Sequence, residues 1–133
     1  MKNKGVLLGL FFLGLVFTQG CSPAEEKLSQ ELNEQVMSLH DKLMPQTEQI
    51  VQLKGTLDSL SHGKDSTHVK RLIQSLDRAD QSMMDWMHQF SVDSLEKLDV
   101  KAKMLYLSKQ LGQLKHVEAI TDSSLTAAKK YVQ

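Results

Sequence analysis

Residues 32–60 read LNEQVMSLHDKLMPQTEQIVQLKGTLDSL. Apolar side chains recur in this stretch with alternating spacings of four and three, and the pattern is interrupted once, at Gln46. The apolar positions are Leu32, Val36, Leu39, Leu43, Ile50, Leu53, Leu57 and Leu60. This spacing places them on one face of a helix and is typical of coiled-coil packing. The pattern therefore predicts one long amphipathic helix that ends near Leu60.

A proline lies inside this predicted helix. Pro45 has no backbone N–H to donate, and its ring crowds the carbonyl of Asp41. We therefore expect the helix to continue with a kink near residues 41–45.

A second helix follows after a short turn. Gly63 is the expected end of the first helix, and Asp65 or Ser66 is the expected cap of the second, which runs to about residue 90. Its apolar positions are Val69, Leu72, Ile73, Leu76, Ala79, Met83, Trp86, Met87 and Phe90. Asp80 falls on the same seam. Either the seam drifts toward Ala79, or Asp80 meets a polar group of another helix, because a buried carboxylate needs a partner.

Residues 91–99 are a predicted connector to a third helix. Asp93 and Glu96 have the spacing of a capping box, which would support a single helical turn there. The third helix has its apolar positions at Val100, Met104, Leu107, Leu111, Leu114, Leu125, Ala128 and Val132. Polar residues occupy two of its seam positions, at Glu118 and Thr121. Residues 121–124 are thus a candidate break that would cap a short fourth helix at the C-terminus.

Three long amphipathic segments bury their apolar faces most simply as an all-α, antiparallel three-helix bundle. No segment alternates with period two, as a half-buried strand would. The predicted organisation is a signal peptide at 1–20, a lipidated cysteine and spacer at 21–26, and a helical bundle domain at 27–133.

The first residues predict export. The chain starts with MKNK and continues with a thirteen-residue apolar run from Gly5 to Phe17, the pattern of a secretory signal peptide. A helix needs about 20 residues to cross a hydrocarbon core of about 30 Å, so this run is too short for a transmembrane anchor.

Cys21 is the only cysteine of the chain and follows this run. Residues 18–21, TQGC, resemble a bacterial lipobox, whose cysteine is acylated, although Thr18 and Gln19 stand where such boxes usually have Leu and a small residue. The resemblance implies lipidation of Cys21 and membrane attachment, since two or three acyl chains bind a bilayer stably. The alternative is ordinary cleavage after Gly20, which leaves a free thiol.

The residues after the cysteine indicate where in the cell the protein is located. Glu25 and Glu26 resemble the acidic export signals of surface lipoproteins of Bacteroidota, and Ser22 resembles an outer-membrane sorting residue. The resemblance implies a cell-envelope protein, anchored to the outer membrane on its periplasmic or surface face. Without Lys2 and Lys4, 14 basic residues stand against 16 acidic ones. This balance argues against nucleic acid as a partner.

Methionine and histidine gather in two stretches, MSLHDKLMP at 37–45 and MMDWMH at 83–88. If the chain turns near residue 63, His40 lies level with about residue 86 in an antiparallel pair. The flanks of the two seams would then bring together His40, Met44, Met84 and His88, with Met83 and Met87 beneath them. Thioether and imidazole donors together favour Cu(I), so the sequence predicts a copper site here.

The competing interpretation is that these methionines only pack in the core and that these histidines bind no metal. Methionine is a common core filler, and Met83, Met87 and Met104 lie on predicted seams. His40 and His88 would then be solvated flank residues. The paired motifs also resemble small helical lipoproteins of Bacteroidota, which are sometimes labelled by analogy with viral A-type inclusion proteins. That resemblance implies a helical bundle and a lipid anchor, and it implies no activity.

The expected function is that of a lipid-anchored helical-bundle binding protein of the cell envelope, with copper as its leading ligand. The alternative is a structural or protein-interaction lipoprotein whose methionines only pack. We expect no enzyme, because no nucleophile elbow, phosphate loop or metalloprotease motif is present in the sequence.

Overall fold

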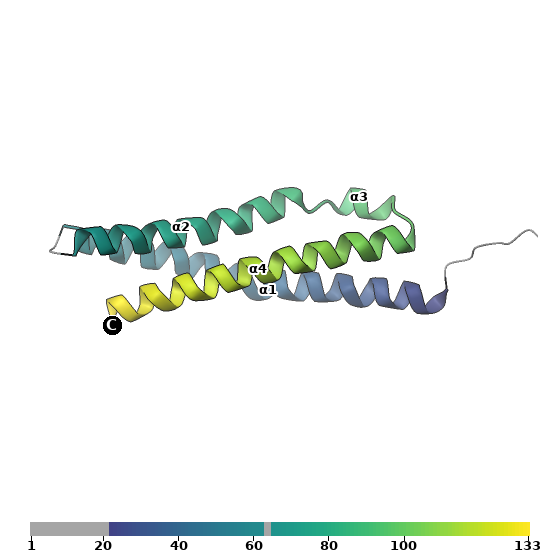
Figure 1. Cartoon of the computed structure of the whole chain (residues 1–133), viewed down its shortest axis with the longest axis horizontal. Coiled ribbons are helices and arrows are strands. Elements are labelled where there is room, and N and C mark those ends of the chain that lie inside the picture. Colours follow the sequence, from purple (N-terminus) through teal and green to yellow (C-terminus); the bar gives the residue numbers. More distant parts are fainter. Residues whose placement is uncertain (1–21, 63–64) are drawn as a thin grey trace, which may run out of the picture.

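The computed structural model describes residues 22–62 and 65–133, and all regular structure in these two ranges is helical (Figure 1). Four helices pack together: α1 (Pro23–Leu60), α2 (Ser66–Gln89), α3 (Val92–Glu96) and α4 (Val100–Val132). The three long helices contact one another pairwise, and α3 is a single short helix in the link between α2 and α4. The prediction of an all-helical chain is therefore confirmed. No described helix is both long enough and apolar enough to traverse a lipid bilayer.

The start of α1 is fixed by a reciprocal cap. Glu25 N–H donates to Ser22 Oγ over 3.2 Å, and Ser22 N–H donates to Glu25 Oε2 over 3.1 Å. Pro23 takes the first helical position, where its missing N–H costs nothing because that group has no partner in a helix anyway. The helix thus begins within residues 21–26, which were expected to be the lipidated cysteine and a spacer before the bundle.

The core follows the heptad pattern of the sequence. In α1 the buried positions recur every seventh residue, at Ser29, Val36, Leu43, Ile50 and Leu57. One core cluster contains Val36, Leu43, Met83, Trp86, Leu107, Leu111, Leu114 and Val117. The second contains Ile50, Leu57, Val69, Leu72, Leu76, Ala79, Leu125 and Ala128. Each cluster takes residues from all three long helices, so none of the three is stable without the others.

Polar contacts between helices give their relative directions. Lys42 Nζ donates to Glu118 Oε1 over 2.6 Å, and Gln46 Nε2 donates to Asp122 Oδ1 over 3.3 Å. Residue numbers rise together in these two pairs, so α1 and α4 run parallel.

The contacts of α2 with α4 run the other way. Ser75 Oγ lies 2.8 Å from Ser124 Oγ, and Trp86 Nε1 donates to the carbonyl of Gln110 over 3.3 Å. The residue number rises in α2 as it falls in α4, so α2 is antiparallel to α4 and hence to α1.

The third long helix is unbroken, and the predicted break at residues 121–124 is wrong. Thr121 and Ser124 are buried inside α4. Ser124 Oγ donates to the carbonyl of Ser75 over 3.2 Å and contacts the Ser75 hydroxyl. Because the hydroxyl finds a partner on α2, a polar residue is tolerated on the seam and no short C-terminal fourth helix forms.

The short helix α3, which lies in the connector before α4, has a different N-cap residue from the one predicted. Ser91 is the N-cap of α3, and its hydroxyl accepts from Ser94 N–H over 3.2 Å. Asp93 lies in the first turn of α3, so the expected capping box of Asp93 with Glu96 is wrong. The serine has an extended backbone, which is the geometry that lets an N-cap side chain reach back to the third helical amide.

Two alternatives were open for the cap of α2 and two for its apolar seam, and the structure agrees with one of each. Asp65 is the N-cap residue, although its side chain makes no capping hydrogen bond. Ala79 is fully buried while Asp80 is half-buried, so the seam passes through Ala79. The carboxylate avoids the core in this way. Gly63, the expected end of the first helix, lies outside the described residues.

Pro45 lies within α1, which continues past it to Leu60 as expected. Its side chain is exposed, so the ring does not disturb the core seam. The bend expected at this residue stays a prediction.

Candidate functional site

Of the predicted histidine and methionine residues, His40 lies where α1 meets α2. The rings of His40 and Trp86 have centroids 5.7 Å apart, so His40 is level with residue 86 as the antiparallel register predicted. His40 Nδ1 lies 3.0 Å from Asp41 Oδ1. The Asp41 carboxylate is thus positioned to accept a hydrogen bond from this ring nitrogen.

The methionines of this region divide between core and surface. Met83 is 2% exposed and belongs to the first core cluster, and Met87 is partly buried and packs against it. The packing interpretation is confirmed for these two residues. Met44 and Met84 are 37% and 40% exposed. Neither residue belongs to a core cluster.

His88 is exposed on α2, two residues beyond the buried Trp86. Within residues 22–62 and 65–133, no three or more His, Cys, Asp and Glu side chains are grouped so that they could hold a metal ion. Any copper site here would depend on the thioethers of Met44 and Met84. The gathering of His40, Met44, Met84 and His88 around one ion stays a prediction. Cys21, the predicted lipidation site, lies outside the described residues.

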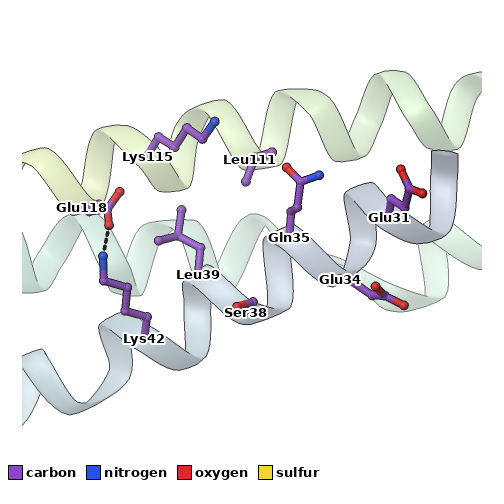
Figure 2. A pocket seen from close by; sticks show the side chains of 9 residues that line it. All are labelled: Glu31, Glu34, Gln35, Ser38, Leu39, Lys42, Leu111, Lys115 and Glu118. Atoms are coloured by element: carbon purple, nitrogen blue, oxygen red, sulfur yellow. Dashed lines mark hydrogen bonds and ion pairs between the residues drawn. The ribbon is translucent and has the colours of Figure 1, made fainter.

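A groove between α1 and α4 was not anticipated from the sequence (Figure 2). Its volume is about 570 Å³, and Leu39 of α1 and Leu111 of α4 lie at its centre. Leu111 is 8% exposed and belongs to the first core cluster, so little apolar surface is open at this point of the groove. The groove is open along the helices and does not enclose a small molecule.

Charged residues lie toward both ends of this groove. Glu31 and Glu34 project from α1 at one end, while Lys42, Lys115 and Glu118 lie toward the other, where Glu118 pairs with Lys42, as Figure 2 shows. The Glu118 carboxylate, through its hydrogen bond and its charge, raises the pKa of Lys42 above the usual 10.5. Because Glu118 balances the charge of Lys42, the positive charge at this end of the groove comes from Lys115.

The sequence carried one partial signal of this groove. Glu118 was identified as a polar residue on the third apolar seam, and the structure pairs it with Lys42 at the edge of α1. The pairing requires α1 and α4 to lie side by side. Because the two residues are 76 positions apart, the sequence alone could not match them.

A second groove of about 560 Å³ lies between α2 and α4. It is lined by Trp86 and Val117 from the core and by Asp85, Lys109 and His116 at its edges. Gly112 also lines it, and a Cβ placed there would meet no atom within 4 Å. The described surface therefore offers elongated grooves along helix pairs.

Comparison with known proteins gives no relative: no family model, curated protein or solved structure matches the chain. Its function is therefore inferred from its own residues and their geometry.

Proposed function

We propose that the protein is a lipid-anchored, non-catalytic binding protein of the cell envelope. The apolar run before Cys21 and the lipobox-like residues around it support export and acylation. The start of α1 at Pro23 supports a domain held close to the bilayer, because only Ser22 separates the helix from the acylated residue.

We further propose that the domain is an antiparallel three-helix bundle in which α3 only shapes the link between α2 and α4. Two features support this description: the pairwise contacts of the three long helices, and the opposite direction of α2. Aliphatic and aromatic side chains from all three helices fill its two core clusters. Ligands are therefore expected on its surface.

The α1–α4 groove is the proposed docking surface for an amphipathic helix of another envelope protein. The observation that carries this proposal is its charge order, with Glu31 and Glu34 toward one end and Lys115 toward the other. A complementary helix has basic residues opposite the glutamates, acidic residues opposite the lysine, and apolar residues between. Complementary charge of this kind selects orientation and partner more than it adds affinity.

Site-specific photo-crosslinking in cells tests this docking. A photoreactive residue in place of Ser38, which lines the groove, should give one discrete cross-linked product. The same residue in place of exposed Ser59, on α1 outside the groove, should not. Lys115→Glu should weaken the Ser38 product, whereas Lys130→Glu, an equal charge change at an exposed site of α4, should not. Equal products at Ser38 and Ser59, or no effect of Lys115→Glu, would contradict the proposal.

Copper is a second candidate ligand, supported by the exposure of Met44 and Met84 on the helix pair that holds His40. Cu(I) prefers thioether and imidazole donors. Because the His40 ring is 5.7 Å from the Trp86 ring, bound copper should quench Trp86 fluorescence. His40→Ala combined with Met44→Ala should abolish the quenching, and Met37→Ala, at an exposed methionine outside the predicted set, should not. Identical titrations for all three proteins would exclude this site.

A further inference from the structure

Three methionines of the described chain are exposed, although the residue is usually a core filler. Met37, Met44 and Met84 are 39%, 37% and 40% exposed, whereas Met83, the chain neighbour of Met84, is 2% exposed. The core clusters are formed without the three exposed residues. Packing therefore does not explain why methionine stands at these positions.

The exposed methionines of α1 belong to one stripe. Met37, His40 and Met44 are spaced by three and four residues, so they lie one above another along the helix. Since His40 packs against Trp86, this stripe lies on the side of α1 that turns toward α2. Met84 of α2 follows the buried Met83 in the same way that Met44 follows the buried Leu43.

The thioether has one characteristic reaction at such a position. A sulfur lone pair attacks one oxygen of hydrogen peroxide, the S–O bond forms, the O–O bond breaks, and the departing oxygen leaves as water after proton transfer. Sulfur loses two electrons to the peroxide and becomes a sulfoxide, which is polar. In a core this change disrupts packing, whereas at an exposed side chain it alters only the surface.

We propose that Met37, Met44 and Met84 are sites of oxidation by peroxide, and that the fold keeps its stability when all three are sulfoxides. Their sulfur atoms react from the native state because solvent reaches them. Met83 reacts only when the helices separate, so its rate follows the small population of opened molecules. Oxidation makes the methionine side chains of this stripe polar and uses one sulfur lone pair for the S–O bond, so each sulfur becomes a poorer donor to a soft metal and a poorer contact for an apolar partner.

Peptide mass spectrometry after timed exposure of the folded, full-length mature protein to hydrogen peroxide tests this proposal. Met37, Met44 and Met84 should be oxidised within a few-fold of the rate of free methionine, and Met83 at least about a hundredfold more slowly. The half-buried Met87 and Met104 should fall between them. The midpoint of thermal unfolding, followed by circular dichroism, should be unchanged once the three exposed residues are oxidised.

Two variants serve as matched controls. Replacing Met37, Met44 and Met84 by Leu should remove the fast oxygen uptake, while Met83→Leu should leave it unchanged and keep a volume-conserving core. Oxidation of Met83 as fast as that of Met84, or a fall in the unfolding midpoint as the first three sulfoxides form, would overturn the proposal. The measurement needs neither a partner nor a metal ion, so its outcome is independent of the proposed docking and copper binding.

Discussion

Individual side chains in this protein divide sharply between core and solvent, and Leu43 and Leu105 are the clearest contrast. Leu43 is 1% exposed and lies in the first core cluster, whereas Leu105 is 75% exposed on α4. Leu43→Ala should lower the free energy of unfolding by about 2–5 kcal/mol, because it removes transfer energy and leaves a cavity. Urea denaturation measures this change.

Leu105→Ala is the matched control for that measurement. It deletes the same atoms from a site in solvent, so the free energy of unfolding should change by no more than about 0.5 kcal/mol. Similar losses for the two variants would show that the core is not where the structure places it.

Two glycines at the surface of the long helices are sites where a substitution should stabilise the protein. A Cβ at Gly55 or Gly112 would meet no atom within 4 Å, so alanine fits at both. Each Gly→Ala change should raise the free energy of unfolding by about 0.5–1 kcal/mol, since alanine restricts the unfolded chain and favours the helix. Thermal unfolding of the single variants checks this, and a destabilised Gly112→Ala would mean that the α2–α4 groove is tighter than described.

Single residues also mark the limits of the sequence interpretation. The register of His40 with Trp86 was predictable, because seam spacing and turn position together fix which residues are level. The N-cap at Ser91 was not predicted, because Asp93 and Glu96 have the spacing of a capping box. In the structure Ser91 N–H donates to the Tyr106 hydroxyl of α4 over 2.9 Å, a contact that local sequence does not reveal.

At the level of whole helices, α1 combines a strict heptad with an interior proline. Pro45 leaves the carbonyl of Asp41 without its helical donor, at a cost of up to about 3 kcal/mol. Pro45→Ala should therefore raise the free energy of unfolding by about 1–3 kcal/mol. Glu48→Ala, at another exposed position of α1, should change it by no more than about 0.5 kcal/mol in the same denaturation experiment. Equal stability of Pro45→Ala and the parent would mean that a bend already satisfies this carbonyl.

The existence of the three long helices was predictable, while the continuity of α4 was not. The spacing of apolar residues predicted all three long helices, and their ends at Leu60 and near residue 90 agree with α1 and α2. The break expected at residues 121–124 is absent because Ser124 hydrogen-bonds to Ser75 on α2. Such a partner is 49 residues away, so local sequence cannot reveal it.

For the molecule as a whole, the sequence predicted which faces are apolar but not which polar edges meet. The α1–α4 groove exists because two parallel helices bring Lys42 beside Glu118 and leave Leu39 and Leu111 between charged rims. The register of the two Met/His stretches and the burial of Met83 beneath the more exposed Met44 and Met84 agree with the predicted arrangement, while binding of copper there stays a prediction.

Attachment to a membrane is the central claim, since the proposed docking and the location both depend on it. Intact-mass spectrometry of the protein purified from the membrane fraction tests it most directly. We predict a chain that begins at Cys21 and carries acyl groups on that residue, and a Cys21→Ser variant that is no longer acylated and leaves the membrane fraction. An unmodified Cys21 thiol on protein recovered without membranes would contradict the account.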